Sequence, residues 1–180
     1  MLVNEPLRTA KGLAERVLKV NHAGEHGAVN IYAGQLLVAR LTAPGLLEEL
    51  AEFQSHERRH RSIFQAELQR RGVRRCRSYH LCGVGGFVLG VLTALFGRGA
   101  IAATTVAVER VVLRHLERQL HELRGVDEAA VDAIRSIVIE EQQHHDRAIV
   151  HAQASCIWAR VLTPVVAAST ETVIWFGMRL

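Results

Sequence analysis

Residues 55–60 read SHERRH and residues 140–146 read EEQQHHD, and each stretch contains a Glu and a His three positions apart. In an α-helix this spacing places both side chains on one face, so that both can reach the same metal ion. A single Glu-x-x-His match is weak evidence, because a chain with 10 His and 18 acidic residues is expected to contain about one by chance. The surrounding sequence must therefore decide what the two matches mean.

The two motifs belong to an internal repeat. Glu25 precedes Glu57 of the first motif by the same separation as Glu109 precedes Glu141 of the second. Each half of the chain thus has a lone Glu followed, at an identical distance, by Glu-x-x-His. This pattern predicts a duplicated helical hairpin whose two copies face each other. The predicted metal ligands are Glu25, Glu57, His60, Glu109, Glu141 and His144.

Four carboxylates and two imidazoles are the ligand set of the ferritin-like di-iron and di-manganese proteins. Carboxylates offset the charge of two divalent ions, and these oxygen and nitrogen ligands suit iron or manganese. The alternative is that these are surface charges on amphipathic helices. However, Glu109 lies in the apolar run TTVAVERVVL, and Phe53 and Phe64 flank Glu57 at helical spacing. We therefore predict a two-metal site inside a four-helix bundle.

Composition and periodicity predict an all-α chain with a single domain over residues 1–180. The presence of only 3 Pro and 5% aromatic residues argues against an all-β fold. Apolar positions recur at helical intervals, and residues 1–12 are expected to form a flexible tail. The predicted helices cover about 13–41, 46–71, 99–124, 127–154 and 155–180.

Residues 81–97, LCGVGGFVLGVLTALFG, carry no charge and follow a basic cluster. This combination is typical of docking to anionic lipid, and we expect residues 81–98 to form an extra apolar helix in the membrane interface, assisted by the C-terminal helix. The alternative is a buried Gly-rich helix beside a solvated loop. Nucleic acid is a poorer fit to the basic cluster, because Tyr79 is the only aromatic residue near it and no nucleic-acid motif is present. The cluster comprises Arg70, Arg71, Arg74, Arg75 and Arg77.

Other polar residues near the motifs receive separate predictions. His115, nearly two turns after Glu109, is the candidate catalytic residue, expected to line the site or relay protons. Asp146 could orient a ligand imidazole, with a solvated helix face as the alternative. Glu140 is expected to be exposed. Three further residues are expected to lie outside the site: His22, His26 and Gln35.

The three cysteines, Cys76, Cys82 and Cys156, form no CxxC pair and are odd in number, which favours a reducing compartment. The stretch that begins the chain, MLVNEPLRTAKGLAERVLKV, has no continuous apolar segment and therefore does not predict a secretory signal. Its basic character could suggest a transit peptide, but helical periodicity from about Leu13 leaves little room for one.

Four stretches together resemble one known family: NHAGEHGAVNIYAGQL (21–36), SHERRH, TTVAVERVV (104–112) and EEQQHHD. The family is that of the demethoxyubiquinone monooxygenases of ubiquinone biosynthesis, and the resemblance runs from about Arg16 to the C-terminus. It implies a di-iron enzyme at the surface of a membrane, on the cytoplasmic face of a bacterial inner membrane or the matrix face of a mitochondrial one. A homo-oligomer or a complex with another ubiquinone-biosynthesis protein is a further implication.

The resemblance also implies a reaction. A 3-demethoxyubiquinol 3-hydroxylase-type monooxygenase would use two Fe²⁺ ions, dioxygen and an unidentified reductant to hydroxylate the ring of a polyprenylated demethoxyubiquinone. We expect the substrate to enter from the bilayer between the apolar helix and the bundle. Carried over by motif, Glu25 and Glu109 are terminal ligands, Glu57 and Glu141 bridge, and each His binds one iron.

The chain departs from the family pattern at two places. His26 stands where a Tyr is usual, and Leu116 stands where many members have a Tyr after the His. The predicted ligands are intact, but no role can be carried over to a tyrosine at position 116. Two other functions fit the ligand set: iron storage, and hydroxylation of a soluble or tRNA substrate. The uncharged run at 81–97 argues against a storage shell.

Overall fold

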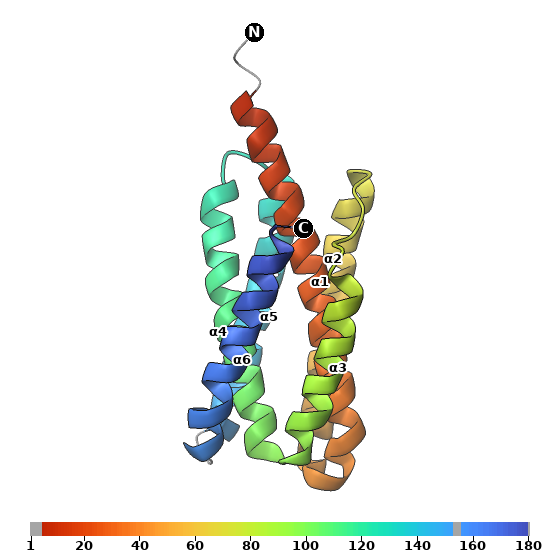
Figure 1. The fold of residues 1–180 in the computed structure, drawn as a ribbon, viewed down its shortest axis with the longest axis vertical. Coiled ribbons are helices and arrows are strands. Elements are labelled where there is room, and N and C mark those ends of the chain that lie inside the picture. The colour runs from red at the N-terminus through yellow and green to blue at the C-terminus, as the bar shows by residue number, and fades with distance from the viewer. Residues whose placement is uncertain (1–4, 153–155, 180) are drawn as a thin grey trace.

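The computed structural model describes residues 5–152 and 156–179, and within them all regular structure is helical (Figure 1). This confirms the predicted all-α class. A short 3-10 turn, Pro44–Leu46, joins the first two helices. The six α-helices are α1 (Glu5–Thr42), α2 (Leu47–Arg70), α3 (Tyr79–Leu95), α4 (Arg98–Leu123), α5 (Glu128–Ala152) and α6 (Cys156–Gly177).

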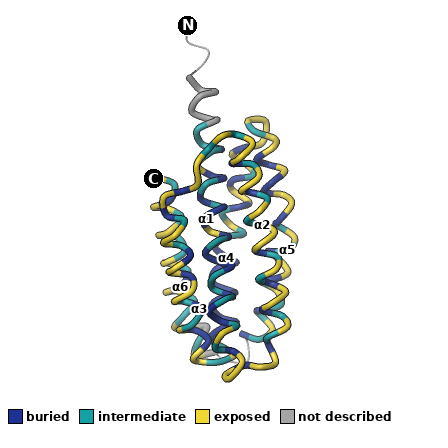
Figure 2. The backbone as a smooth tube through the Cα atoms, turned by 90° about the vertical axis from the view of Figure 1, so that its right-hand side faces the viewer, coloured by how far each residue is buried: buried dark blue, intermediate teal, exposed yellow. Residues whose placement is uncertain are grey.

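Two helical hairpins form the centre of the molecule. Helix α1 packs against α2, and α4 packs against α5, while α2–α5 and α1–α4 contacts join the hairpins. Two helices lie outside them: α3 runs along α1, and α6 runs along α4 (Figure 1). The cover by α6 explains why residues 100–109 of α4 are all buried, as the dark stretch of α4 indicates in Figure 2. Both hairpins thus present helix faces to one interior.

Glycines end three of the helices. Gly72, Gly97 and Gly125 follow α2, α3 and α4, and each has a positive φ, between 65° and 78°. Only glycine adopts this conformation without a steric penalty, which makes it the usual residue after a helix C-terminus. The stops predicted at Gly72 and Gly125 are therefore the observed ones.

The helix boundaries differ from the prediction at the two ends of the chain. Helix α1 begins at Glu5 rather than near Leu13, because Pro6 suits a first helical turn and the following residues are good helix formers. Residues 1–4 of the expected flexible tail lie outside the described residues. Likewise, positions 155 and 180 of the expected last helix fall outside them.

Two apolar clusters lie on either side of a polar layer along the bundle. In α2, Leu50 and Phe53 belong to one cluster, Phe64 and Leu68 belong to the other, and the first Glu-x-x-His motif lies between them. Leu116 of α4 is part of the second cluster. The polar layer is therefore enclosed by hydrocarbon from both ends of the bundle.

Helix α3 approaches α1 very closely through glycines. A Cβ atom at Gly90 would overlap the carbonyl oxygen of Ile31, and one at Gly86 would overlap that of Gly27. On the opposite side of the contact, a Cβ at Gly34 would overlap the Phe87 carbonyl. Among the described helices, none combines the length and the apolarity that crossing a membrane requires.

The close contact predicts opposite effects for two glycine substitutions in α3. Gly90→Ala should lower the free energy of unfolding by about 1–3 kcal/mol, because the new methyl group forces α3 away from α1. Gly85→Ala should raise it by about 0.5–1 kcal/mol, because Gly85 faces open space and Ala is the better helix former. Urea denaturation followed by circular dichroism measures both. Equal stability of the two variants would contradict the proposed packing.

Candidate metal centre

The structure brings all six predicted ligand residues together in the polar layer of the bundle. They come from four helices, one from each first helix of a hairpin and two from each second helix. All are buried, and none has more than 6% of its surface exposed. The six are Glu25 of α1, Glu57 and His60 of α2, Glu109 of α4, and Glu141 and His144 of α5.

These residues form two overlapping groups, and each could hold a metal ion. Within each group, one candidate ligand atom per residue lies within 4.8 Å of all the others. Glu57 and Glu141 belong to both groups, so their carboxylates lie where a bridge between two ions would be. The first group is Glu25, Glu57, His60 and Glu141, and the second is Glu57, Glu109, Glu141 and His144.

Each imidazole faces a carboxylate of the opposite hairpin. The Nδ1 atom of His60 lies 2.8 Å from Oε1 of Glu141, and Nδ1 of His144 lies 3.1 Å from Oε1 of Glu57. Since the two hairpins are related by the internal repeat, the two contacts are equivalent. The site therefore has an approximate two-fold arrangement.

Several of these buried atoms have no hydrogen-bond partner. They are both carboxylate oxygens of Glu57, Oε1 of Glu141, and the Nδ1 atoms of His60 and His144. Buried polar atoms are normally paired, so carboxylate oxygens and imidazole nitrogens that converge without forming hydrogen bonds are free to bind an ion. Oxygen and imidazole donors without thiolates fit iron or manganese. The residues present therefore fit a pair of metal ions.

The crowding of charge shifts the pKa values strongly. Burial, together with the neighbouring carboxylates, raises the pKa of Glu25 and of Glu109 well above the usual value. Burial opposes a charge on the imidazoles, but the nearby carboxylates of Glu141 and Glu57 outweigh it and raise the pKa of His60 to about 10 and that of His144 to about 9. Without metal, protons thus supply the positive charge that these carboxylates require.

The outer nitrogens of the two imidazoles have different partners. Nε2 of His60 lies 2.7 Å from Oε2 of Glu140, which also pairs with Arg59. Nε2 of His144 lies 3.0 Å from Nδ1 of His56. The prediction that Glu140 is exposed was wrong: its side chain is 28% exposed and faces the other hairpin. The sequence did contain a signal for these two contacts. Glu140 and His56 occupy equivalent positions, because each directly precedes the Glu of a Glu-x-x-His motif.

Two polar residues considered for roles near the metal site, Asp146 and His115, do not contact the six predicted ligands. Asp146 is 62% exposed and contacts His145 and Gln142, so the solvated alternative is the observed one. His115 points toward α6, where its Nε2 lies 2.7 Å from Oε2 of Glu171. Six residues further along a helix, the His115 side chain points about one-third of a turn away from that of Glu109. His115 does not join either group, and its catalytic role stays a prediction.

Tyr32 is a site residue that the sequence analysis missed. Its buried hydroxyl donates a hydrogen bond of 3.2 Å to Oε1 of Glu109. The sequence contained a signal for this residue: Tyr32 follows Glu25 by seven residues and therefore lies on the same face of the helix. Burial, and then Glu109, raise the pKa of Tyr32 well above its usual value, so it remains a donor.

The three residues expected outside the site do lie outside both groups. His22 and His26 stack on Tyr79, with ring centroids 4.9 and 3.9 Å apart. Gln35 is fully buried, and its amide contacts Thr93 of α3.

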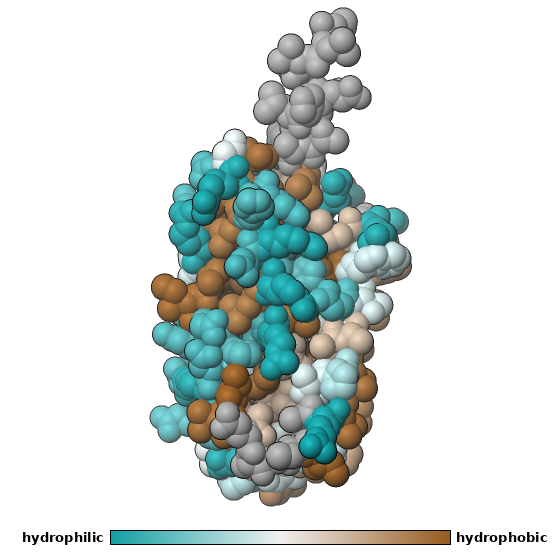
Figure 3. Space-filling view, turned by 90° about the vertical axis from the view of Figure 1, so that its left-hand side faces the viewer, coloured by the Kyte–Doolittle hydropathy of each residue, from teal (hydrophilic) through white to brown (hydrophobic). Residues whose placement is uncertain are grey.

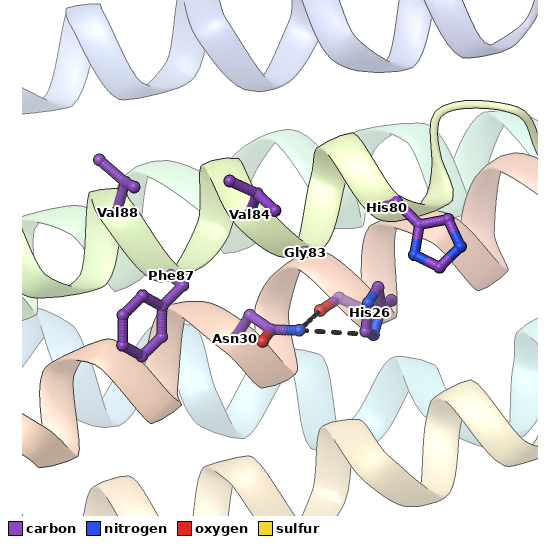
Figure 4. A pocket seen from close by; sticks show the side chains of 7 residues that line it. All are labelled: His26, Asn30, His80, Gly83, Val84, Phe87 and Val88. Carbon is purple, nitrogen blue, oxygen red and sulfur yellow. Dashed lines mark hydrogen bonds between the residues drawn. The ribbon is translucent and has the colours of Figure 1, made fainter.

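Two hollows border α1. The larger, of about 330 Å³, lies between α1 and α3 and has His26, Asn30 and His80 at its polar side and Val84, Phe87 and Val88 at its apolar side (Figure 4). None of the six predicted ligands lines it. The smaller, of about 10 Å³, lies between α1 and α4 and is bordered by side chains that include Tyr32 and Glu109. Of these two hollows, the smaller one reaches the Glu/His groups, and its volume is about that of one water molecule.

Comparison with known proteins gives consistent similarities. Residues 12–177 match the family described as Ubiquinone biosynthesis protein COQ7. The NADPH-dependent 3-demethoxyubiquinone 3-hydroxylase of Dictyostelium discoideum is 33% identical over 180 residues, covering 98% of this chain and 82% of that protein. The human mitochondrial protein of the same name is 31% identical, covering 95% and 80%. The 3-demethoxyubiquinol 3-hydroxylase of Rhodospirillum rubrum is 34% identical, covering 93% and 79%.

The pKa shifts predict that the metal-free protein loses stability as the pH rises from 7 to 10. His60 and His144 keep protons in the folded state that the unfolded chain releases near pH 6.5, so unfolding releases protons. The stabilisation is complete below about pH 6.5, and above it the free energy of unfolding falls by at most about 1.4 kcal/mol per pH unit for each retained proton.

Urea denaturation of metal-free protein at pH 7, 8 and 9 measures this slope. The His144→Gln variant is the control, because it retains one proton fewer and should show a shallower slope. A free energy of unfolding that stays constant or rises over this range contradicts the pKa shifts.

Proposed function

Because this chain belongs to the COQ7 family of ubiquinone biosynthesis proteins, we propose that it is a di-iron monooxygenase of the 3-demethoxyubiquinol 3-hydroxylase type. Its substrate is the ring of a polyprenylated demethoxyubiquinone, and its oxidant is dioxygen. The observation that carries the proposal is the pair of overlapping buried Glu/His groups that share two carboxylates. The storage alternative has no comparable support, since the relatives above are named hydroxylases.

In this proposal the ferritin-like bundle holds two Fe²⁺ ions. Glu57 and Glu141 would contribute to both positions, Glu25 and His60 would complete one, and Glu109 and His144 would complete the other. When bound, the irons supply the reduction of dioxygen that ring hydroxylation needs.

The surrounding side chains orient the ligands and exclude water. Tyr32 donates to Glu109 and so fixes the orientation of that carboxylate. The Phe53 ring lies 4.3 Å from the His144 ring and shields it. The apolar clusters at both ends of the polar layer keep solvent from the site, which protects a reactive oxidant from side reactions.

The small hollow between α1 and α4 suggests where the quinone ring approaches. Its borders include Ile31 and Val108 in addition to Tyr32 and Glu109, so it combines an apolar entrance with a predicted iron ligand. Around Gly90, by contrast, the glycine contacts leave no room for a ring between α1 and α3, and the larger hollow between these two helices has no predicted ligand at its border. We therefore assign ring entry to the α1–α4 side, with side-chain movement to admit a ring. This differs from the α3 route expected from the sequence.

We also propose that the protein docks on a membrane surface through α3 and α6. Both helices expose apolar side chains. On the side of the molecule shown in Figure 3, which is that of α4 and α6 rather than of α3, apolar patches lie among polar side chains. Arg74, Arg75 and Arg77 are exposed beside α3, whereas Arg70 and Arg71 pair with Glu67 and Asp127. The exposed apolar residues of α3 are Leu81, Val84, Phe87, Val88, Leu92 and Leu95.

Membrane docking predicts that a double substitution in α3 weakens vesicle binding. Phe87→Ser with Leu92→Ser should reduce partitioning onto vesicles containing anionic phospholipid roughly tenfold or more, because each side chain loses apolar burial in the interface. Ile139→Ser with Val150→Ser is the matched control, since both are exposed apolar residues of α5. Vesicle co-sedimentation measures partitioning. Equal losses for the two pairs, or none for the α3 pair, would refute the docking face.

The proposed reaction predicts that Glu57→Ala and His144→Ala abolish hydroxylation. Each variant removes a ligand, so bound iron should fall below two per chain and product should fall at least about 100-fold. The assay is anaerobic iron loading, then addition of a demethoxyubiquinone, a chemical reductant and oxygen, with mass spectrometry of a product one oxygen atom heavier. Glu48→Ala, on the exposed side of α2, is the control. Normal iron content and turnover in both ligand variants would refute the assignment.

A further inference from the structure

The internal repeat places Glu140 and His56 at equivalent positions, because each directly precedes the Glu of its motif. Their contacts are equivalent too. Glu140 of α5 reaches His60 of α2, with 2.7 Å between Oε2 and Nε2. His56 of α2 reaches His144 of α5, with 3.0 Å between Nδ1 and Nε2. The geometry is thus repeated, but the chemistry is not, because one partner is a carboxylate and the other an imidazole.

A second pair of equivalent positions breaks the two-fold arrangement in the same way. Tyr32 follows Glu25 by seven residues, and Leu116 follows Glu109 by seven. The phenol of Tyr32 reaches across the hairpins and donates to Glu109. Leu116 has no donor to offer and packs in an apolar cluster. Of the carboxylates of Glu25 and Glu109, only that of Glu109 therefore accepts a hydrogen bond from a residue at these two positions.

Both differences act on metal binding in the same direction. An imidazole whose N–H donates to a carboxylate is held in one tautomer and is a stronger metal ligand than one whose N–H meets a neutral acceptor. A carboxylate that accepts a hydrogen bond from a phenol is a weaker donor to metal. The His60 position has the anionic partner and the unshared carboxylate, Glu25. The His144 position has the neutral partner and the shared carboxylate, Glu109.

We infer that the two metal positions are unequal, and that Glu140 and His56 are the positioning residues that make the His60 position bind the first ion more tightly than the His144 position binds the second. This inference rests on the proposed two-iron site. Arg59 strengthens the difference, because it pairs with Glu140 and holds that carboxylate against the His60 ring. The first ion enters at Glu25 and His60, and the second completes the site at Glu109 and His144.

Anaerobic calorimetric titration of the whole metal-free chain with Fe²⁺ tests the inference. The wild type should bind two ions in two resolved steps. Glu140→Gln should weaken the first step about 10- to 100-fold and leave the second within roughly threefold, while His56→Glu should strengthen the second step. Glu48→Gln, which removes an exposed charge from α2, should change neither step.

Mössbauer spectra after one equivalent of ⁵⁷Fe²⁺ give a readout that a general loss of stability does not imitate. The wild type should show one iron environment, and folded Glu140→Gln protein should show two, since the ion then distributes over both positions. Two ions bound with no response to either substitution would overturn the inference and leave the two-iron proposal standing. No binding of Fe²⁺ by the wild type would overturn both.

Discussion

Four carboxylates lie in one buried layer of the helix bundle, and their mutual repulsion is the constraint that the rest of the structure must offset. Burying such groups without compensating charge is costly, and two imidazoles supply only part of the compensation. The raised pKa values of Glu25 and Glu109 on one side, and of His60 and His144 on the other, express this imbalance. Two divalent ions would remove this charge imbalance, and the polar layer is therefore suited to bind metal.

The position of this layer was predictable from the sequence because it depends on helical geometry. Residues three apart share a face, and the equal separation of the lone Glu from Glu-x-x-His in both halves identifies which helices must meet. The same reasoning with a seven-residue spacing would have identified Tyr32, which accompanies Glu25 on one face and donates to Glu109. Gly72 and Gly125 were recognisable as helix ends because a positive φ favours glycine.

The partners of several charged residues depend on which helix packs against which face. The spacing of residues within one helix does not predict that packing. His115 has Glu171 as its partner because α6 lies over α4. Glu140 is partly covered because the facing α2 presents His60 and Arg59 to it, and Arg71 is occupied because Asp127 lies within reach. A charged residue on a helix surface cannot be assigned to solvent before its neighbouring helix is known.

The proposed function depends above all on two metal ions that share Glu57 and Glu141. Iron K-edge X-ray absorption of the loaded protein tests this directly. We predict iron–iron scattering at roughly 3.5–4 Å, together with a first shell of oxygen and nitrogen only. Isolated iron with no metal–metal scattering, or a shell that contains sulfur, would contradict the account.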